Sequence, residues 1–477
     1  MQKNQKIHNH IFPNIDKYKR LSQKYKSVII SITIPNINSD GALLLSYLNS
    51  DEKNPSFIFQ KIPSSGMHPD KTMIGIEIEE IININNTNPM TKLRKILRNQ
   101  KKDIYCEKDI DHLGAFGYVS YECFKYFEKT PELKADPLGC PESLFLIPKT
   151  MATIHHAQNS LTLSTIVSSS RETGSYEKGK TKLEDLVEKI YSFNINLNKI
   201  NTEIDRFLNT KSLPMIEKKD YLKNILNIKK QIIEGELIQC VLTQRFQKSI
   251  EIENAALIYH LCKNYPSEYI YQLVCPDFSI TGSSPEMFLS VKGNIATIRP
   301  VAGTIGNNPN IDNSELEIKL KSSIKDKAEH IMLVDLARND LGKVSKKGTV
   351  KVKSLMETQI YNNVIHLVSE VTGIITNDKD SLDAFSSTFP IGTLVGAPKI
   401  RASKLISDLE PEGRGPYCGA IGWFSKNGNI DTSTIIRTII KKDGKVSFNG
   451  GGGIVFDSVP EVEYQETLDK MRAFIQI

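Results

Sequence analysis

Hydrophobic and polar residues follow two different periods along the chain, and these periods separate predicted strands from predicted helices. Short apolar runs bounded by turn residues lie at 270–274, 278–281, 287–291 and 295–300. Four short strands in succession predict an antiparallel meander. Residues 221–233 instead place apolar side chains at helical spacing, and this predicted helix ends near Gly235.

Runs of strands alternate with runs of helices, which favours the α+β class with sheets packed on each other and helices outside. The segment 211–217 contains Pro214 and separates an N-terminal part, 1–210, from a second part, 217–474. Nearly all candidate chemistry falls in the second part.

The last fifty residues carry the densest pattern. Residues 435–440 are apolar and β-branched around Arg437, which predicts a buried strand. A turn at 441–444 leads into a second strand that runs into four glycines, 450–453. Glycine in a strand gives up packing area, and its usual reason is close approach of the backbone to a ligand or to another segment.

Acidic residues on two predicted helices form a candidate cation site. Glu463 and Glu466 are three residues apart on a helix that begins near Pro460, so their carboxylates share one face. Glu329 lies in the first turn of another predicted helix, 329–341. Carboxylates from separate helices are ligands that Mg²⁺ uses. Ordinary surface acids would give the same pattern, so the spacing alone leaves both readings open.

Three residues are candidates for binding an anion. A guanidinium within an apolar run must be paired, so Arg437 contacts either a ligand carboxylate or an internal acid. Tyr417 could donate a phenol hydrogen bond or belong to the core. Thr393 lies in a glycine-rich turn before a predicted helix, an arrangement that binds anions.

Other residues could move protons or close the site. Glu286 follows a Ser-Pro turn and could be a general acid if it is buried. His366 lies in the apolar run 364–368, where a histidine is also typical of a core. Gly303 and Thr304 end another predicted strand. Together these residues predict an α+β enzyme that binds a small polycarboxylate with Mg²⁺.

Composition narrows the compartment and the partners. The chain has 477 residues, of which 39% are hydrophobic and 24% charged, as in an ordinary globular protein. The net charge of +6 is scattered without a basic stripe, so nucleic acid is not an expected partner. Seven dispersed cysteines, no secretory apolar core at the start and no apolar run of ~20 residues predict a cytoplasmic protein outside the membrane.

Seven motifs, in order, resemble the chorismate-utilising enzymes, and most closely the anthranilate synthase component I family. The motifs are IRPVAGT, EHIMLVDLARNDLGKV, NVIHLVSEVTG, GTLVGAPKIRA, RGPYCGAIGWF, DTSTIIRT and GGGGIVFDSVPEVEYQET. The resemblance covers 217–474, and the N-terminal part matches more faintly through GAFGYVSYE and DPLGCPESLFLIP.

The resemblance implies two large antiparallel sheets packed as a sandwich, with helices outside and the active site between the sheets. It implies a chorismate-binding catalytic domain at 217–474 and a regulatory-type α/β region at 1–210. It implies Mg²⁺ on Glu329, Glu463 and Glu466. Substrate contacts are implied for Arg437, Tyr417, Thr393, Gly303, Gly451, Gly452 and Gly453, and catalytic roles for Glu286, His366, Thr304 and Gln239.

The nucleophile separates members of the resembled family. Enzymes that add water carry a lysine base where this chain has Gln239, and aminodeoxychorismate synthases typically carry a lysine where it has Ala302. The resemblance therefore implies ammonia addition at C2 of chorismate and pyruvate elimination to anthranilate. Ammonia would come from a separate glutamine amidotransferase subunit, component II, in a hetero-oligomer. The alternatives are an aminodeoxychorismate synthase component I and a non-catalytic carboxylate-binding regulatory subunit.

One region departs from the resembled family. Its tryptophan-feedback pocket usually has Leu-Leu-Glu-Ser where this chain has IFQK at 58–61, and Asn-Pro-Ser-Pro-Tyr-Met where it has YPSEYI at 265–270. The changes alter both charge and shape, which predicts weak or absent inhibition by tryptophan. The positions of this degenerate effector pocket are Gln60, Lys61, Pro266, Tyr269 and Ile270.

Overall fold

Strand β6 (Ser143–His155) is the junction of a branched antiparallel sheet in the computed structural model. One edge of β6 follows β3, whereas the other edge pairs with β5 at its start and with β7 at its end. The structure describes residues 11–35, 41–48, 53–63, 69–107, 112–130, 132–169, 174–306, 312–361 and 364–475. Within these ranges, 21 strands form one hydrogen-bonded network.

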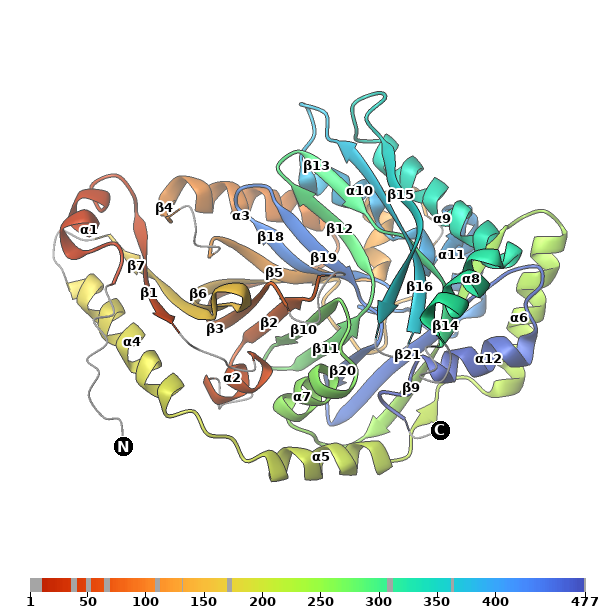
Figure 1. The fold of residues 1–477 in the computed structure, drawn as a ribbon, viewed down its shortest axis with the longest axis horizontal. Coiled ribbons are helices and arrows are strands. Elements are labelled where there is room, and N and C mark those ends of the chain that lie inside the picture. The colour runs from red at the N-terminus through yellow and green to blue at the C-terminus, as the bar shows by residue number, and fades with distance from the viewer. Residues whose placement is uncertain are drawn as a thin grey trace.

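Two long arms leave this junction and face each other (Figure 1). The first arm contains, in order of pairing, β3 (Lys71–Ile84), β2 (Ser56–Lys61), β10 (Tyr269–Val274), β11 (Phe278–Ser284), β20 (Thr438–Lys442), β21 (Lys445–Ile454) and β9 (Gln239–Ser249). The second contains β5 (Gly114–Val119), β18 (Ala420–Ser425), β19 (Ile430–Thr434), β12 (Met287–Lys292), β13 (Ile295–Ile298) and β16 (Val364–Ile374), and β16 also pairs with β14 (Val301–Gly306) and β15 (Lys351–Tyr361).

The remaining strands complete the network. Beyond β6 lie β7 (Ser160–Ser168), β1 (Ser27–Pro35) and β4 (Ile104–Tyr105), and β1–β4 is the parallel pairing among the described strands. Two-residue strands, β17 (Gly396–Ala397) and β8 (Leu213–Pro214), pair with opposite ends of β9. The predicted α+β class with large antiparallel sheets packed on each other is confirmed, and the two sheets are arms that share β6.

Aromatic rings fill the space between the arms. Phe57 of the first arm stacks on Phe116 of the second with ring centroids 4.6 Å apart, and Trp423 lies 6.1 Å from Phe57. All three side chains are buried. Because each large ring removes a large apolar area from water, this layer is a main source of the attraction between the arms.

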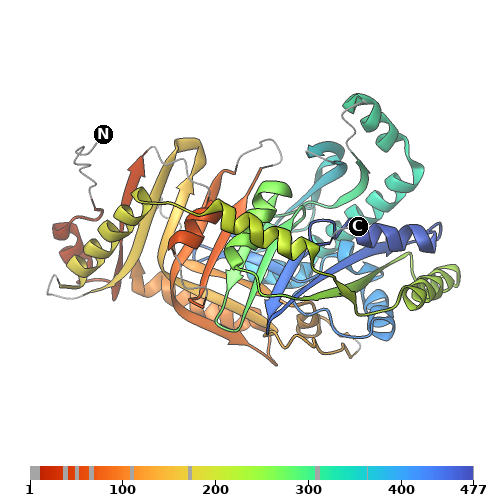
Figure 2. The same cartoon turned by 90° about the horizontal axis from the view of Figure 1, so that it is seen from below.

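The helices cover the outside and the ends of the sheet (Figures 1 and 2). They are α1 (Ile15–Leu21), α2 (Gly41–Leu48), α3 (Pro89–Asp103), α4 (Gly174–Tyr191), α5 (Leu197–Asn209), α6 (Lys218–Ile233), α7 (Asn254–Asn264), α8 (Asn313–Ser322), α9 (Ile324–Gly342), α10 (Ser381–Thr388), α11 (Lys399–Leu409) and α12 (Pro460–Asp469), with short 3₁₀ turns η1 (Tyr121–Tyr126), η2 (His156–Gln158) and η3 (Gly392–Leu394). Helices α1 and α4 lie at one end, and α6, α9 and α12 at the other. Helix α9 packs on β14 and β16, and α12 packs on β21 and α6.

The predicted strand at 435–440 is wrong at its start. Strand β19 ends at Thr434 in the second arm, and β20 begins at Thr438 in the first. The chain must therefore cross between the arms within three residues, and Arg437 takes a left-handed conformation with φ of 49°. The apolar character of this segment reflects burial between the arms rather than a strand.

The predicted boundary at 211–217 contains β8. Strands from both sides of it pair with each other, β2 with β10 and β5 with β18. The division into 1–210 and 217–474 stays a prediction, and both parts build both arms.

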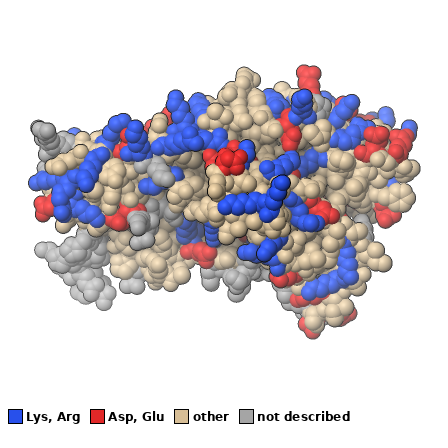
Figure 3. Space-filling model, turned by 90° about the horizontal axis from the view of Figure 1, so that it is seen from above, with Lys and Arg blue, Asp and Glu red and all other residues tan. Residues whose placement is uncertain are grey.

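Surface properties add little to the sequence prediction. On the face in Figure 3, lysine and arginine are spread among acidic and uncharged residues. In the described part of the chain, no helix combines the length and hydropathy that crossing a membrane requires.

Candidate active site

The four glycines at 450–453 let neighbouring segments approach strand β21 closely. A Cβ on Gly451 would lie 2.7 Å from Cγ2 of Thr243 in β9, and a Cβ on Gly453 would overlap the side-chain amide of Gln239. A Cβ on Gly450 would lie 2.6 Å from the main-chain oxygen of Thr467 in α12. Larger residues would push β9 and α12 away, so the predicted reason for these glycines, close approach of other segments, is confirmed.

The predicted cation ligands converge on this strand. A Cβ on Gly452 would lie 3.3 Å from Oε2 of Glu463 and 3.9 Å from Oε1 of Glu466, both on α12. A Cβ on Gly453 would lie 3.6 Å from Oε1 of Glu329 on α9. Gln239 donates its Nε2 hydrogen to Oε1 of Glu329 at 2.9 Å. Three carboxylates from two helices therefore border one short stretch of backbone.

Lys470 belongs to the same cluster, although its role was not predicted. Its ammonium lies 2.6 Å from Oε1 of Glu466, one helical turn away, and donates to the main-chain oxygen of Gly451 at 2.9 Å. The spacing of Glu466 and Lys470 is that of an ordinary surface ion pair, so the sequence offered no signal beyond position. Only the packing of α12 on β21 brings this lysine to the site.

The carboxylate cluster fits a hard divalent ion in chemistry but is not a complete cage. Among the described residues, no group of three His, Cys, Asp or Glu side chains is arranged to hold a metal by itself. Mg²⁺ typically takes one or two protein carboxylates and completes its shell with substrate oxygens and water. Glu466 is paired with the Lys470 ammonium, and both side chains are partly exposed.

Arg437 and Tyr417 form the candidate anion site. Within the described residues, no hydrogen bond or ion pair engages the Arg437 guanidinium, which is only partly exposed. Burial lowers the pKa of Arg437, and the neighbouring Tyr417 opposes this shift. Burial raises the pKa of Tyr417 well above its ordinary value, so its phenol stays a neutral donor. A partly buried guanidinium of this kind is suited to a ligand carboxylate.

Glu286 has the properties of a general acid. Its side chain is buried, and burial raises its pKa to about 7. The Thr393 hydroxyl donates to Oε1 of Glu286 at 2.7 Å and partly opposes that shift. A carboxyl group that keeps its proton near neutral pH can protonate a leaving group. Thr393 therefore contacts the candidate acid directly, and its role as an anion contact stays a prediction.

His366 faces the same region from β16. Burial, helped by the charge of Arg437, lowers its pKa to about 4, so the imidazole is neutral at neutral pH. Thr304 is the register partner of His366 in β14, and the side chain of Thr304 lies outside the described part. Gly303 has a φ of 73°, and its main chain forms a hydrogen bond with His366.

Electrostatic effects link Glu286, the His366 imidazole and the carboxylate cluster. The Lys470 charge acts on both Glu286 and His366, while Arg437 acts on His366. Lys470 itself contacts Glu466. Residues of β16, β21, α9 and α12 thus share one site with Glu286, just before β12, and Lys470, just after α12. The site lies at the end of the sandwich that carries α6, α9 and α12 (Figure 1).

Comparison with known proteins decides the family. The family model described as chorismate binding enzyme matches residues 46–476. The chain belongs to the chorismate-binding enzyme family. It is 34% identical over 471 residues to a probable anthranilate synthase component 1 of Schizosaccharomyces pombe, covering 97% of this chain and 96% of the relative. It is 39% identical over 377 residues to anthranilate synthase component 1 of Acetivibrio thermocellus, covering 76% and 74%.

Solved structures agree with the family assignment. The crystal structure of anthranilate synthase component I from Streptococcus pneumoniae is 28% identical, with a TM-score of 0.75 over 87% of this chain and 94% of that chain. MenF, the menaquinone-specific isochorismate synthase from Escherichia coli, shares the fold at 20% identity, with a TM-score of 0.72 over 97% and 98%.

In this member of the chorismate-binding enzymes, the predicted effector positions are neighbours in space. Tyr269 is the register partner of Lys61, and Ile270 that of Gln60, across β10 and β2. The Lys61 ammonium lies 3.0 Å from Oδ1 of Asp431 and 4.9 Å from the centre of the Tyr269 ring. The Tyr269 hydroxyl also donates to Asp431, at 2.8 Å. Gln60 accepts from Thr72, and Pro266 is exposed.

The closeness of β21 to its neighbours is testable by Gly453→Ala. The added methyl overlaps the end of the Gln239 side chain, which must move and lose its hydrogen bond to Glu329, so we expect the free energy of unfolding to fall by about 1 kcal/mol. Gly342→Ala is the matched control, since a Cβ there meets nothing within 4 Å and alanine favours a helix. Urea unfolding measures both variants, and equal stabilities would show that β21 does not need glycine at 453.

Proposed function

We propose that this chain is the large component of an anthranilate synthase, which aminates chorismate at C2 and eliminates pyruvate to form anthranilate. The names of its relatives support the reaction, and the site supplies groups suited to it. Arg437 and Tyr417 would hold a substrate carboxylate, and Thr393, Gly303 and the backbone of 451–453 would close around it. Glu286 would protonate the departing C4 hydroxyl, because hydroxide is a poor leaving group.

One observation carries the choice of nucleophile, namely the amide at position 239. Gln239 lies beside the carboxylate cluster and donates to Glu329, so it offers no base that could activate water. Ammonia already has a lone pair and needs no base to begin its attack. The lysine that the site does contain, Lys470, is bound to Glu466 and to Gly451, where it is suited to hold a ring carboxylate rather than to take a proton.

We propose that Glu329, Glu463 and Glu466 hold Mg²⁺ when substrate binds. The ion would act as a Lewis acid and as a template for a substrate carboxylate. His366, neutral at this site, would accept a hydrogen bond or proton during pyruvate loss, with Thr304 as its strand neighbour. Ammonia would come from a separate glutamine amidotransferase, component II, so the working enzyme would be a hetero-oligomer.

The product identifies the reaction directly. The purified chain is incubated with chorismate, Mg²⁺ and ammonium, and fluorescence follows anthranilate while a coupled assay follows pyruvate. We expect equal amounts of both products without an added lyase. A stable amino-chorismate would instead assign an aminodeoxychorismate synthase, and binding of chorismate without turnover would assign a non-catalytic subunit. Glutamine should replace ammonium only after component II is added.

The role of Glu286 predicts a pH dependence. The acid must be protonated, and its folded pKa is about 7, so kcat/KM should fall as pH rises through about 7. The measurement is made at constant free ammonia, because the ammonia supply itself rises with pH. Glu286→Gln should lose about 10²- to 10⁴-fold in kcat, the usual contribution of a general acid. Glu217→Gln, which changes an exposed acid paired with Lys219, should keep wild-type rates.

The effector region predicts insensitivity to tryptophan. The Lys61 ammonium already holds the Asp431 carboxylate and the Tyr269 ring, two groups that would recognise the ammonium of a bound amino acid. We expect turnover to be unaffected by micromolar tryptophan, and calorimetry to detect no tight binding. Leucine at the same concentration serves as the control, and inhibition specific to tryptophan in the micromolar range would refute the prediction.

A further inference from the structure

The segment that carries Thr393 is held at both ends by buried cations. This segment, 388–395, runs from the end of α10 to β17 and includes η3. Lys399 donates to the main-chain oxygen of Thr388 at 3.0 Å. Arg414 donates to the main-chain oxygen of Leu394 at 2.8 Å. Neither cation touches Glu286, but the residue between their two attachment points does, through the Thr393 hydroxyl.

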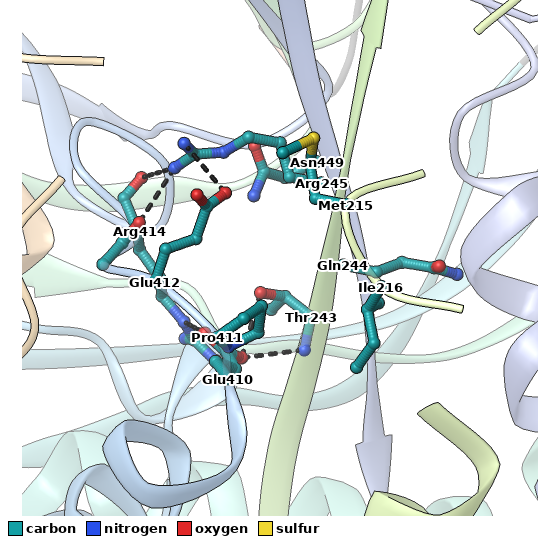
Figure 4. A pocket seen from close by; sticks show the side chains of 11 residues that line it. Met215, Ile216, Thr243, Gln244, Arg245, Glu410, Pro411, Glu412, Arg414 and Asn449 are labelled. Atoms are coloured by element: carbon teal, nitrogen blue, oxygen red, sulfur yellow. Dashed lines mark hydrogen bonds and ion pairs between the residues drawn. The ribbon is translucent and has the colours of Figure 1, made fainter. Parts of the chain in front are cut away.

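Each cation has its own buried carboxylate. Lys399 lies 2.5 Å from Oδ2 of Asp340, and their side chains are 13% and 7% exposed. Arg414 contacts both carboxylate oxygens of Glu410. Glu410 also accepts hydrogen bonds from the main chain and the hydroxyl of Thr243, beside which it lies in Figure 4. Removing one member of such a pair leaves a buried charge alone, so the attachments resist displacement.

The Lys399–Asp340 pair connects two functional elements. Asp340 lies on α9 eleven residues after Glu329, which is three helical turns, so both side chains project from the same face. Leu336 lies between them on that face and packs against Gly392. A Cβ added to Gly392 would lie 2.6 Å from Cδ1 of Leu336. The pair thus ties the Thr393 segment to the helix that carries a proposed metal ligand.

We propose that Lys399 and Asp340 are positioning residues, whose ion pair fixes segment 388–395 so that the Thr393 hydroxyl stays on Glu286. The inference rests on the proposed function, in which Glu286 is the acid. Lys399 and Asp340 do not touch the reacting atoms, and the proposed effect on Glu286 passes through Thr393. Arg414 and Glu410 hold the other end of the segment.

Loosening the pair has a specific electrostatic consequence. Hydrogen bonds from Thr393 and Thr434 and the charge of Lys470 all lower the pKa of Glu286 against the effect of burial. If Thr393 moves away, this pKa rises, and the fall of kcat/KM moves to higher pH. Substitution of a purely structural residue would lower stability without changing the pH at which kcat/KM falls.

The test compares Lys399→Met, Thr393→Val and the double variant in the full chain. We expect Lys399→Met to lower kcat about 10- to 100-fold with a small change in KM, as for a misplaced catalytic group. The pH at which kcat/KM of Lys399→Met falls should be higher than in wild type, as in Thr393→Val. The double variant should be no slower than the slower single variant. Lys219→Met is the matched control, since Lys219 forms an exposed pair with Glu217, and it should behave as wild type.

Asp340→Asn provides a second, nearly isosteric variant if Lys399→Met does not fold. The inference would be overturned if the losses in kcat multiplied in the double variant. It would also be overturned if kcat/KM fell at the wild-type pH in both Lys399→Met and Asp340→Asn. The wild-type product separates this result from the proposed function. If wild type makes an amino-chorismate, the proposed function fails, whereas wild-type anthranilate formation with normal Lys399 and Asp340 variants removes only the positioning role.

Discussion

The site depends on how closely other segments approach the backbone of strand β21. Where glycine lacks a side chain, the Gln239 amide occupies the space that a Cβ on Gly453 would take, and the carboxylates of α12 lie within contact distance of Gly452. The same strand supplies the Gly451 carbonyl that binds Lys470. Four consecutive glycines cost backbone entropy on folding, and in return β9, β21 and α12 bring their functional groups within contact of each other.

Buried charge is handled in two ways in this fold. Arg414 and Lys399 each have a carboxylate partner and several main-chain acceptors, so their charge is satisfied within the chain. Arg437 is engaged by no such partner among the described residues. Since a desolvated guanidinium without a partner is costly, the contrast separates a charge that holds the scaffold from a charge that is available to a ligand.

The sequence predicted element types more reliably than their spatial relations. The helix at 221–233 and the strands of the meander followed from periodicity, because each reflects local burial. The helix predicted at 329–341 begins earlier, at Ile324, so Glu329 does not lie in its first turn. Residues 435–437 resemble a strand for the same reason, because a segment that crosses between two arms is buried and therefore apolar. No local signal marks Lys470 as a site residue, because its spacing to Glu466 is that of a surface pair. Which carboxylates meet depends on packing between distant elements, which no local pattern contains.

The N-terminal part contributes to the site as well as to the sheet. Glu122 on η1 accepts from the main-chain nitrogens of Arg414 and Gly415, just before Tyr417. Burial raises the pKa of Glu122 to about 7, while these two hydrogen bonds oppose that shift. Gly413 donates to Ala135, and Tyr121 to Gly415, so segment 413–417 is held from the N-terminal side. A boundary in sequence at 211–217 therefore does not separate the groups that build the site, since the loop presenting Tyr417 takes its shape from residues on both sides.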